Sequence, residues 1–164
     1  MEKQRKVAAG MVIAAIWVLP VLWLGFSWGH WIDPLPAIML AGLPGGMVML
    51  TMVARLAAGR FFSPGNIDGE AFAPGSTEEI TQRVLTNTTE QLVLAAAIWP
   101  AAGVLFGPGL PAALGISFGL TRIAFWLGYL KSPPLRAFGF AAGFYPTVVC
   151  AVLSAIVGLG RVFF

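Results

Sequence analysis

The sequence predicts an all-α integral membrane protein with five transmembrane helices. Of its 164 residues, 58% are hydrophobic and only 10% are charged, whereas about a quarter of the residues in a soluble domain carry charge. Its uncharged runs reach the roughly 20 apolar residues that cross a hydrocarbon core about 30 Å thick. Glycine and proline divide these runs, so we expect helices at about 7–28, 35–56, 77–106, 111–131 and 133–160.

Basic residues and turn formers bound the first two helices. The helix over 7–28 follows a basic tail and is longer than the apolar region of a signal peptide, so we expect it to be retained. The helix over 35–56 ends near Arg55, and Pro44 with the two glycines after it predicts a kink. A polar loop over 59–75 follows, and its length is typical of a functional lid.

Capping and turn sequences mark the last three helices. Ser76 and Glu79 form a capping box at the start of the third helix. A Gly-Pro-Gly turn separates the third helix from the fourth, and Pro133 suits the first turn of the fifth. We therefore expect one membrane domain over residues 1–164, without a soluble domain.

The basic residues also predict the orientation, because cytoplasmic loops of membrane proteins are enriched in Lys and Arg. With the N-terminus in the cytoplasm and the C-terminus outside, only Arg161 lies on the outer side. The basic residues on the cytoplasmic side are Lys3, Arg5, Lys6, Arg55, Arg60, Arg83, Lys131 and Arg136. Since they are scattered at segment ends, the net charge of +3 does not indicate nucleic-acid binding.

Neither metal ligation nor disulfide chemistry is expected. His30 and Cys150 fall in different spans without companion ligands, so no metal site is predicted. The single cysteine lies in an apolar run, where it behaves as a small buried hydrophobe.

A polar stripe at the entry of the third helix is the first candidate for a functional site. Arg83, Asn87 and Glu90 are spaced i, i+4 and i+7, which places them within roughly 60° of one another on a helix. The chain then carries no charge until Arg122. Ionisable groups at such depth are costly, and they indicate a functional site by default.

The fourth and fifth helices carry polar groups at the same depth. Arg122 lies nine residues before Lys131, about 13 Å from the cytoplasmic end of its helix. Tyr129 follows it on the same stripe, and Arg136 begins the fifth helix. These residues predict a cationic funnel that opens to the cytoplasm. The alternative is structural: Glu79 and Arg83 form an i, i+4 pair within their helix, Asn87 bonds a neighbouring helix, and Glu90 forms a buried bridge with Arg122.

These residues resemble the MAPEG family, the membrane-associated proteins in eicosanoid and glutathione metabolism. Arg83-x3-Asn87-x2-Glu90 matches the family's signature on one helix. On the next helix, the stretch from Arg122 to Tyr129 matches a second signature, with an arginine seven residues further at Arg136. The resemblance covers roughly residues 35–161. It implies a four-helix bundle, assembled as a homotrimer, with glutathione bound between protomers near the cytoplasmic face.

The resemblance also implies roles for single residues. Arg136 becomes the catalytic residue that stands beside the glutathione thiol. The residues that hold glutathione are Arg55, Arg83, Asn87, Glu90, Arg122 and Tyr129, with Arg60 as the alternative to Arg55. The chain departs from the pattern at Phe125, where the family commonly has tyrosine, and in the additional helix over 7–28. That helix moves the N-terminus to the cytoplasm, so the site stays cytoplasmic, in a membrane such as the bacterial inner membrane.

Two functions remain open on these grounds. The first is a glutathione transferase or glutathione peroxidase, which uses glutathione as a co-substrate against lipophilic electrophiles or lipid hydroperoxides. The second is a non-catalytic membrane protein that binds a lipid or an anionic metabolite on the same scaffold. A transporter is a weaker alternative, because Glu90 and Arg122 alone do not form a chain of ionisable groups across the membrane.

Overall fold

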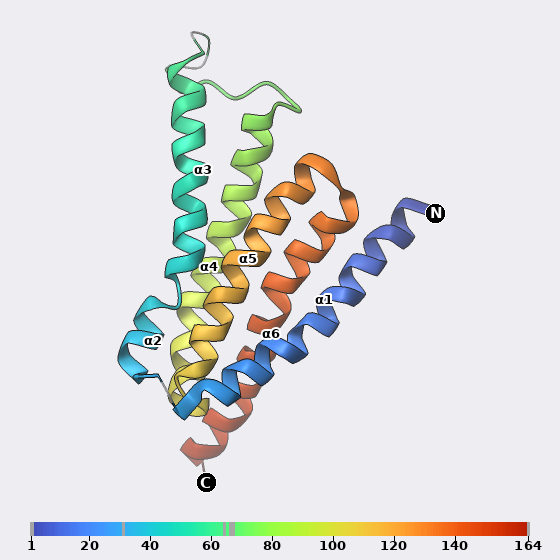
Figure 1. Cartoon of the computed structure of the whole chain (residues 1–164). Coiled ribbons are helices and arrows are strands. Elements are labelled where there is room, and N and C mark those ends of the chain that lie inside the picture. The colour runs from blue at the N-terminus through green and yellow to red at the C-terminus, as the bar shows by residue number, and fades with distance from the viewer. Residues whose placement is uncertain (1, 31, 64, 66–67, 164) are drawn as a thin grey trace.

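The computed structural model describes residues 2–30, 32–63, 65 and 68–163, and its secondary structure is entirely helical (Figure 1). The elements are α1 (Glu2–Ser27), the 3-10 turn η1 (Trp28–His30), α2 (Pro34–Leu40), α3 (Leu43–Phe61), α4 (Thr77–Phe106), α5 (Gly109–Lys131) and α6 (Pro133–Phe163). Five segments are long and apolar enough to cross a membrane, with α2 and α3 together forming the second. The predicted five-span, all-α membrane fold is confirmed.

The second span is two helices rather than one kinked helix over 35–56. A turn at Ala41 and Gly42 ends α2, and α3 restarts with Pro44 in its first turn. Proline has no backbone N–H to donate and its ring clashes with the preceding turn, so Pro44 favours a break in the helix at this point. Prolines also lie inside α1, α4 and α6, where the helix continues, so the break here depends on the local packing as well. The helix then runs to Phe61, five residues beyond the predicted end, because nothing after Leu56 breaks it. In the suspected lid that follows, Pro64, Asn66 and Ile67 lie outside the described residues.

The capping box sets the start of α4. The Ser76 hydroxyl accepts a hydrogen bond from the Glu79 N–H at 3.1 Å. The Glu79 carboxylate reaches back to the Gly75 N–H at 2.9 Å, one residue before the N-cap. Both bonds satisfy donors at a helix start that would otherwise face no partner. They fix where α4 begins, and therefore how far along the helix its polar stripe lies.

Helix α5 lies at the centre of the bundle and packs against α1, α2, α3, α4 and α6 (Figure 1). Glycine permits this close packing. A Cβ at Gly115 would collide with the Ala41 carbonyl, and one at Gly128 would collide with the Arg136 backbone. Small residues allow helix backbones to approach closely in membranes. The contact at Gly128 brings the end of α5 against the first turn of α6.

Helix α1 packs against α5 and α6 of its own chain. A Cβ at Gly10 would lie 2.5 Å from the Pro134 carbonyl oxygen, so glycine is required where α1 crosses α6. Further along, Trp17 donates a hydrogen bond from its indole nitrogen to the Ser117 hydroxyl at 2.9 Å. The additional helix is therefore an integral part of the bundle.

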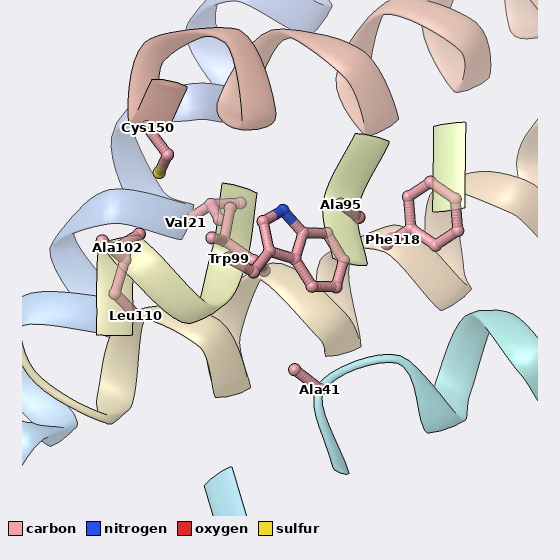
Figure 2. Packing of buried hydrophobic residues seen from close by; sticks show 9 residues of the cluster. Val21, Ala41, Ala95, Trp99, Ala102, Leu110, Phe118 and Cys150 are labelled. Carbon is pink, nitrogen blue, oxygen red and sulfur yellow. The ribbon is translucent and has the colours of Figure 1, made fainter. Parts of the chain in front are cut away.

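All five spans contribute to the apolar core around Trp99 (Figure 2). The Trp99 ring meets Phe118 edge to face with 5.8 Å between centroids, and its indole N–H donates to the Thr147 hydroxyl at 3.2 Å. Other members of this buried cluster are Val21, Ala41, Ala95, Ala102, Leu110, Leu114 and Cys150. This core holds the five spans together. The polar residues lie nearer the end of the bundle that holds the α5–α6 turn (Figure 1).

Candidate functional site

Arg122 is fully buried in the middle of the bundle, on α5. Its guanidinium donates to the Gly139 carbonyl at 2.6 Å and the Phe140 carbonyl at 3.2 Å, both on α6. It also lies over the ring of Phe125, 4.7 Å from the ring centroid. A buried cation is tolerated when its N–H groups find acceptors and aromatic faces surround it. The space comes from Gly143, where a Cβ would lie 2.5 Å from the guanidinium nitrogen.

Asn87 connects this buried arginine to the surface stripe of α4. Its amide oxygen accepts a hydrogen bond from Arg122 at 3.1 Å, and its amide nitrogen donates to the Glu90 carboxylate at 3.4 Å. Glu90 is therefore linked to Arg122 through the amide and makes no direct ion pair with it among the described residues. The direct Glu90–Arg122 bridge of the structural alternative does not form within the chain.

Arg136 and Tyr129 form the second half of the site. The Arg136 guanidinium lies over the Tyr129 ring, 4.9 Å from its centroid. The Arg136 N–H donates to the Ser132 carbonyl at 3.0 Å, which places the arginine in the first turn of α6. Phe125 packs edge to face on Tyr129, with 5.1 Å between centroids. Arg136 is half-buried, so its charge is held by a ring on one side and is free to meet a ligand on the other.

Asn87, Tyr129 and Arg136 all line one cavity with a volume of about 480 Å³. The rest of its wall is mostly apolar: Val7 and Met11 of α1, Phe125 of α5, and Ala137, Phe140 and Tyr145 of α6. A cavity with apolar walls and a few convergent polar groups is the usual form of a small-molecule site. This one brings together an amide, phenols and a guanidinium.

The other residues expected at the site lie outside the cavity. Arg83 is exposed and pairs with Glu79 at 2.5 Å, as the i, i+4 spacing in the structural alternative predicted. Glu90 and Arg55 are also exposed, on α4 and α3 respectively. Arg60 lies over the Phe72 ring at 4.7 Å. The structure thus brings Asn87 together with Tyr129 and Arg136. It leaves Arg55, Arg83 and Glu90 on the outer faces of the chain and buries Arg122 behind Asn87, outside the cavity lining.

Sequence reasoning missed the walls that α1 and α6 provide. Val7, Met11 and Tyr145 carry no motif, and their place at the cavity follows only from the way α1 crosses α6. A usable signal existed for α6, because Gly139 and Gly143 form a G-x3-G pattern that favours close helix contact. That pattern marks the face of α6 that receives Arg122.

The sequence was compared with models of known protein families. A model of the MAPEG family matches residues 34–156. The chain belongs to the MAPEG family. Comparison with the curated proteins finds no match.

The match begins at the first residue of α2 and ends within α6. Helix α1 of this MAPEG protein therefore lies outside the matched segment, although two of its residues line the cavity. Membership of the family makes the chain a multi-pass integral membrane protein related to enzymes that include glutathione transferases.

Proposed function

We propose that this MAPEG protein is an integral-membrane enzyme that uses glutathione as co-substrate, as a transferase to lipophilic electrophiles or a peroxidase of lipid hydroperoxides. The observation that carries the proposal is Arg136 above the Tyr129 ring, at the wall of a cavity that is otherwise mostly apolar. A fixed cation and an apolar space are the two elements that an anionic thiolate and a lipophilic partner require.

The chemistry follows from the charge of Arg136. A nearby guanidinium lowers the pKa of a thiol, and the thiolate is the nucleophile. In a transfer, the sulfur bonds to the electrophilic carbon, and the displaced electron pair goes to the leaving group, to the oxygen of an opened ring, or to the enolate of a conjugated aldehyde, which then takes up a proton. In peroxide reduction, the sulfur attacks the peroxide oxygen, and a second glutathione completes the disulfide with release of an alcohol and water. Arg136 is the group proposed to hold the thiolate in both cases.

The residues outside the cavity support recognition of the rest of glutathione. Glutathione carries two carboxylates and one ammonium group. The arginines Arg55 and Arg83 suit carboxylates through their fork geometry, and Glu90 suits the ammonium group. Because these side chains are exposed on α3 and α4, a second copy of the chain is proposed to close the site. This arrangement is consistent with a homotrimer that binds one glutathione at each interface.

The proposed orientation has the N-terminus and the site in the cytoplasm and the C-terminus outside, in a membrane such as the bacterial inner membrane. The excess of Lys and Arg at the end of the bundle near the site supports it. Glutathione would then be supplied from the cytoplasm and the lipophilic partner from the bilayer.

The first experiment measures glutathione binding by calorimetry to the detergent-purified protein and to Glu90→Gln, which removes the charge while keeping the shape. Saturable binding that the variant loses supports the site. If millimolar glutathione neither binds nor raises the melting temperature of the wild type, the enzyme proposal fails. The polar groups then serve another anion or lipid, as in a non-catalytic MAPEG-like protein.

The second experiment compares turnover by Arg136→Ala and Arg136→Lys. Loss of the cation raises the pKa of the bound thiol, so less thiolate is present at neutral pH. We expect Arg136→Ala to bind glutathione but to lose at least about tenfold in turnover at pH 7, since one pKa unit is a tenfold change in thiolate. Its pH–rate profile should move to higher pH, and Arg136→Lys should recover part of the activity. Equal turnover in wild type and Arg136→Ala would remove Arg136 from the mechanism.

A further inference from the structure

Two apolar hollows lie along the contact between α1 and α6. The first is the part of the candidate-site cavity that Val7 and Met11 of α1 line together with residues of α6. The second has a volume of about 420 Å³ and is lined by Ala15, Val18, Leu19 and Leu22 of α1 with Tyr145, Val148 and Val149 of α6. Tyr145 lines both hollows. They are therefore adjacent, and one side chain marks the point where they meet.

The lining residues of α1 recur at helical spacing. Val7, Met11, Ala15, Val18 and Leu22 are separated by three or four residues, so they share one face of the helix. From Val7 to Leu22 this face extends for about 22 Å, at 1.5 Å per residue. The two hollows follow one another along this face of α1, with Tyr145 between them. Together, as a track, they start beside Arg136 and extend along most of a hydrocarbon core about 30 Å thick.

The chemistry of the track changes from one end to the other. Arg136, Tyr129 and Asn87 give the first hollow its polar end. Beyond Tyr145 the lining side chains are all aliphatic. Met11 and Leu19 are 44% and 67% exposed, so the track opens toward the surface that faces lipid. A molecule that satisfies both ends has a polar reactive head near Arg136 and one unbranched apolar chain along α1.

We propose that α1 is a specificity element of this enzyme: together with α6 it forms a groove that holds the acyl chain of the lipophilic co-substrate. The length of the groove beyond Tyr145 sets which chain lengths are favoured. This inference rests on the proposed function, and it assigns a role to a helix that lies outside the matched MAPEG segment. The head of the chain is placed at the thiolate, and its tail lies against Ala15, Val18 and Leu22.

The test uses variants in which a larger side chain fills the second hollow. It measures KM for a homologous series of straight-chain 2-alkenals, with glutathione as co-substrate. In the wild type, the KM expressed against the alkenal concentration in the lipid phase should fall with each methylene that enters the groove, because the groove fits the chain more closely than mobile lipid does. The decrease should stop once the groove is full. Ala15→Phe should stop it at a shorter chain and leave the short alkenals unchanged, because the site beside Arg136 is untouched. Val149→Phe fills the same hollow from α6 and should act in the same way, should Ala15→Phe fail to fold.

Ala9→Phe is the matched control. Ala9 is exposed on the face of α1 that points away from the groove, so the same substitution adds the same bulk without filling it. Its chain-length profile should equal that of the wild type. Identical profiles for Ala15→Phe, Val149→Phe and the wild type would overturn the groove while leaving the enzyme intact.

A binding experiment without glutathione separates this inference from the proposed function. The probes are unreactive straight-chain alcohols of the same lengths, bound to the wild-type protein and the three variants in lipid nanodiscs. Chain-length-dependent binding that Ala15→Phe shortens supports the groove even if glutathione does not bind. Binding that is independent of chain length, or equal in Ala15→Phe and Ala9→Phe, rejects the groove whatever the result with glutathione.

Discussion

Arg122 organises the residues around it although it does not line the cavity. Its bonds to Asn87 and to two carbonyls of α6 tie three helices together at one point. Hydrogen bonds to a charged group typically contribute about 1.5–3 kcal/mol each. Through Asn87, this buried charge also fixes the amide that faces the cavity. We propose that Arg122 acts on the site through this amide, since its side chain does not line the cavity.

The niche around Arg122 leads to the first prediction at the residue scale. Gly143→Ala adds a Cβ 2.5 Å from the guanidinium, so the arginine or the helix must shift. We expect a loss of about 1–3 kcal/mol in stability, as for overpacked interiors, measured as a lower melting temperature in detergent. Gly46→Ala on α3 is the control, because its Cβ meets no atom within 4 Å. Equal melting temperatures for the two variants would contradict the tight niche.

Part of the site was predictable at this scale and part was not. The i, i+4, i+7 spacing on α4 identified Asn87, and the spacing on α5 identified Tyr129. The structure places both beside Arg136. Spacing within one helix says nothing about the rotation of its neighbour, so the carbonyl partners of Arg122 and the position of Tyr145 could not be derived. Contacts between helices depend on the packing of both faces at once.

At the scale of elements, α1 depends on a single close crossing beside the cavity. Gly10→Val places a branched side chain against the Pro134 carbonyl, so α1 should move away from α6. We expect a stability loss of about 1–3 kcal/mol, seen as a lower melting temperature. Ala9→Val, on the exposed neighbouring position, should leave it nearly unchanged. An unchanged melting temperature in both variants would show that the crossing is looser than described.

The elements themselves were largely predictable because their signals are local. Long uncharged runs gave the five spans, and the capping box gave the start of α4 at Thr77. The break between α2 and α3 was expected only as a kink. At this break, the Ala41 backbone packs directly against Gly115 of α5. The sequence of the second span alone contains no information about that contact.

At the scale of the whole molecule, the outer face of the first half of α4 is polar and continues to Glu90, where the helix enters the apolar part of its span. Gln82, Arg83, Thr86, Thr89 and Glu90 are exposed in the single chain. An exposed carboxylate within a span is costly in hydrocarbon, which supports the proposal that other protomers cover this face. Native mass spectrometry from mild detergent should therefore show three copies. A mass of one copy under conditions that preserve glutathione binding would contradict the trimer.

The packing of α1 also affects how the protein is made. The indole of Trp17 and the hydroxyl of Ser117, which it bonds, are separated by 100 residues in the chain. At a synthesis rate of about 5–20 residues per second, α1 remains in the membrane for roughly 5–20 s before α5 is complete. During that time its glycine face has no partner from its own chain and is open to other helices. The first helix to be synthesised is thus among the last to reach its final position.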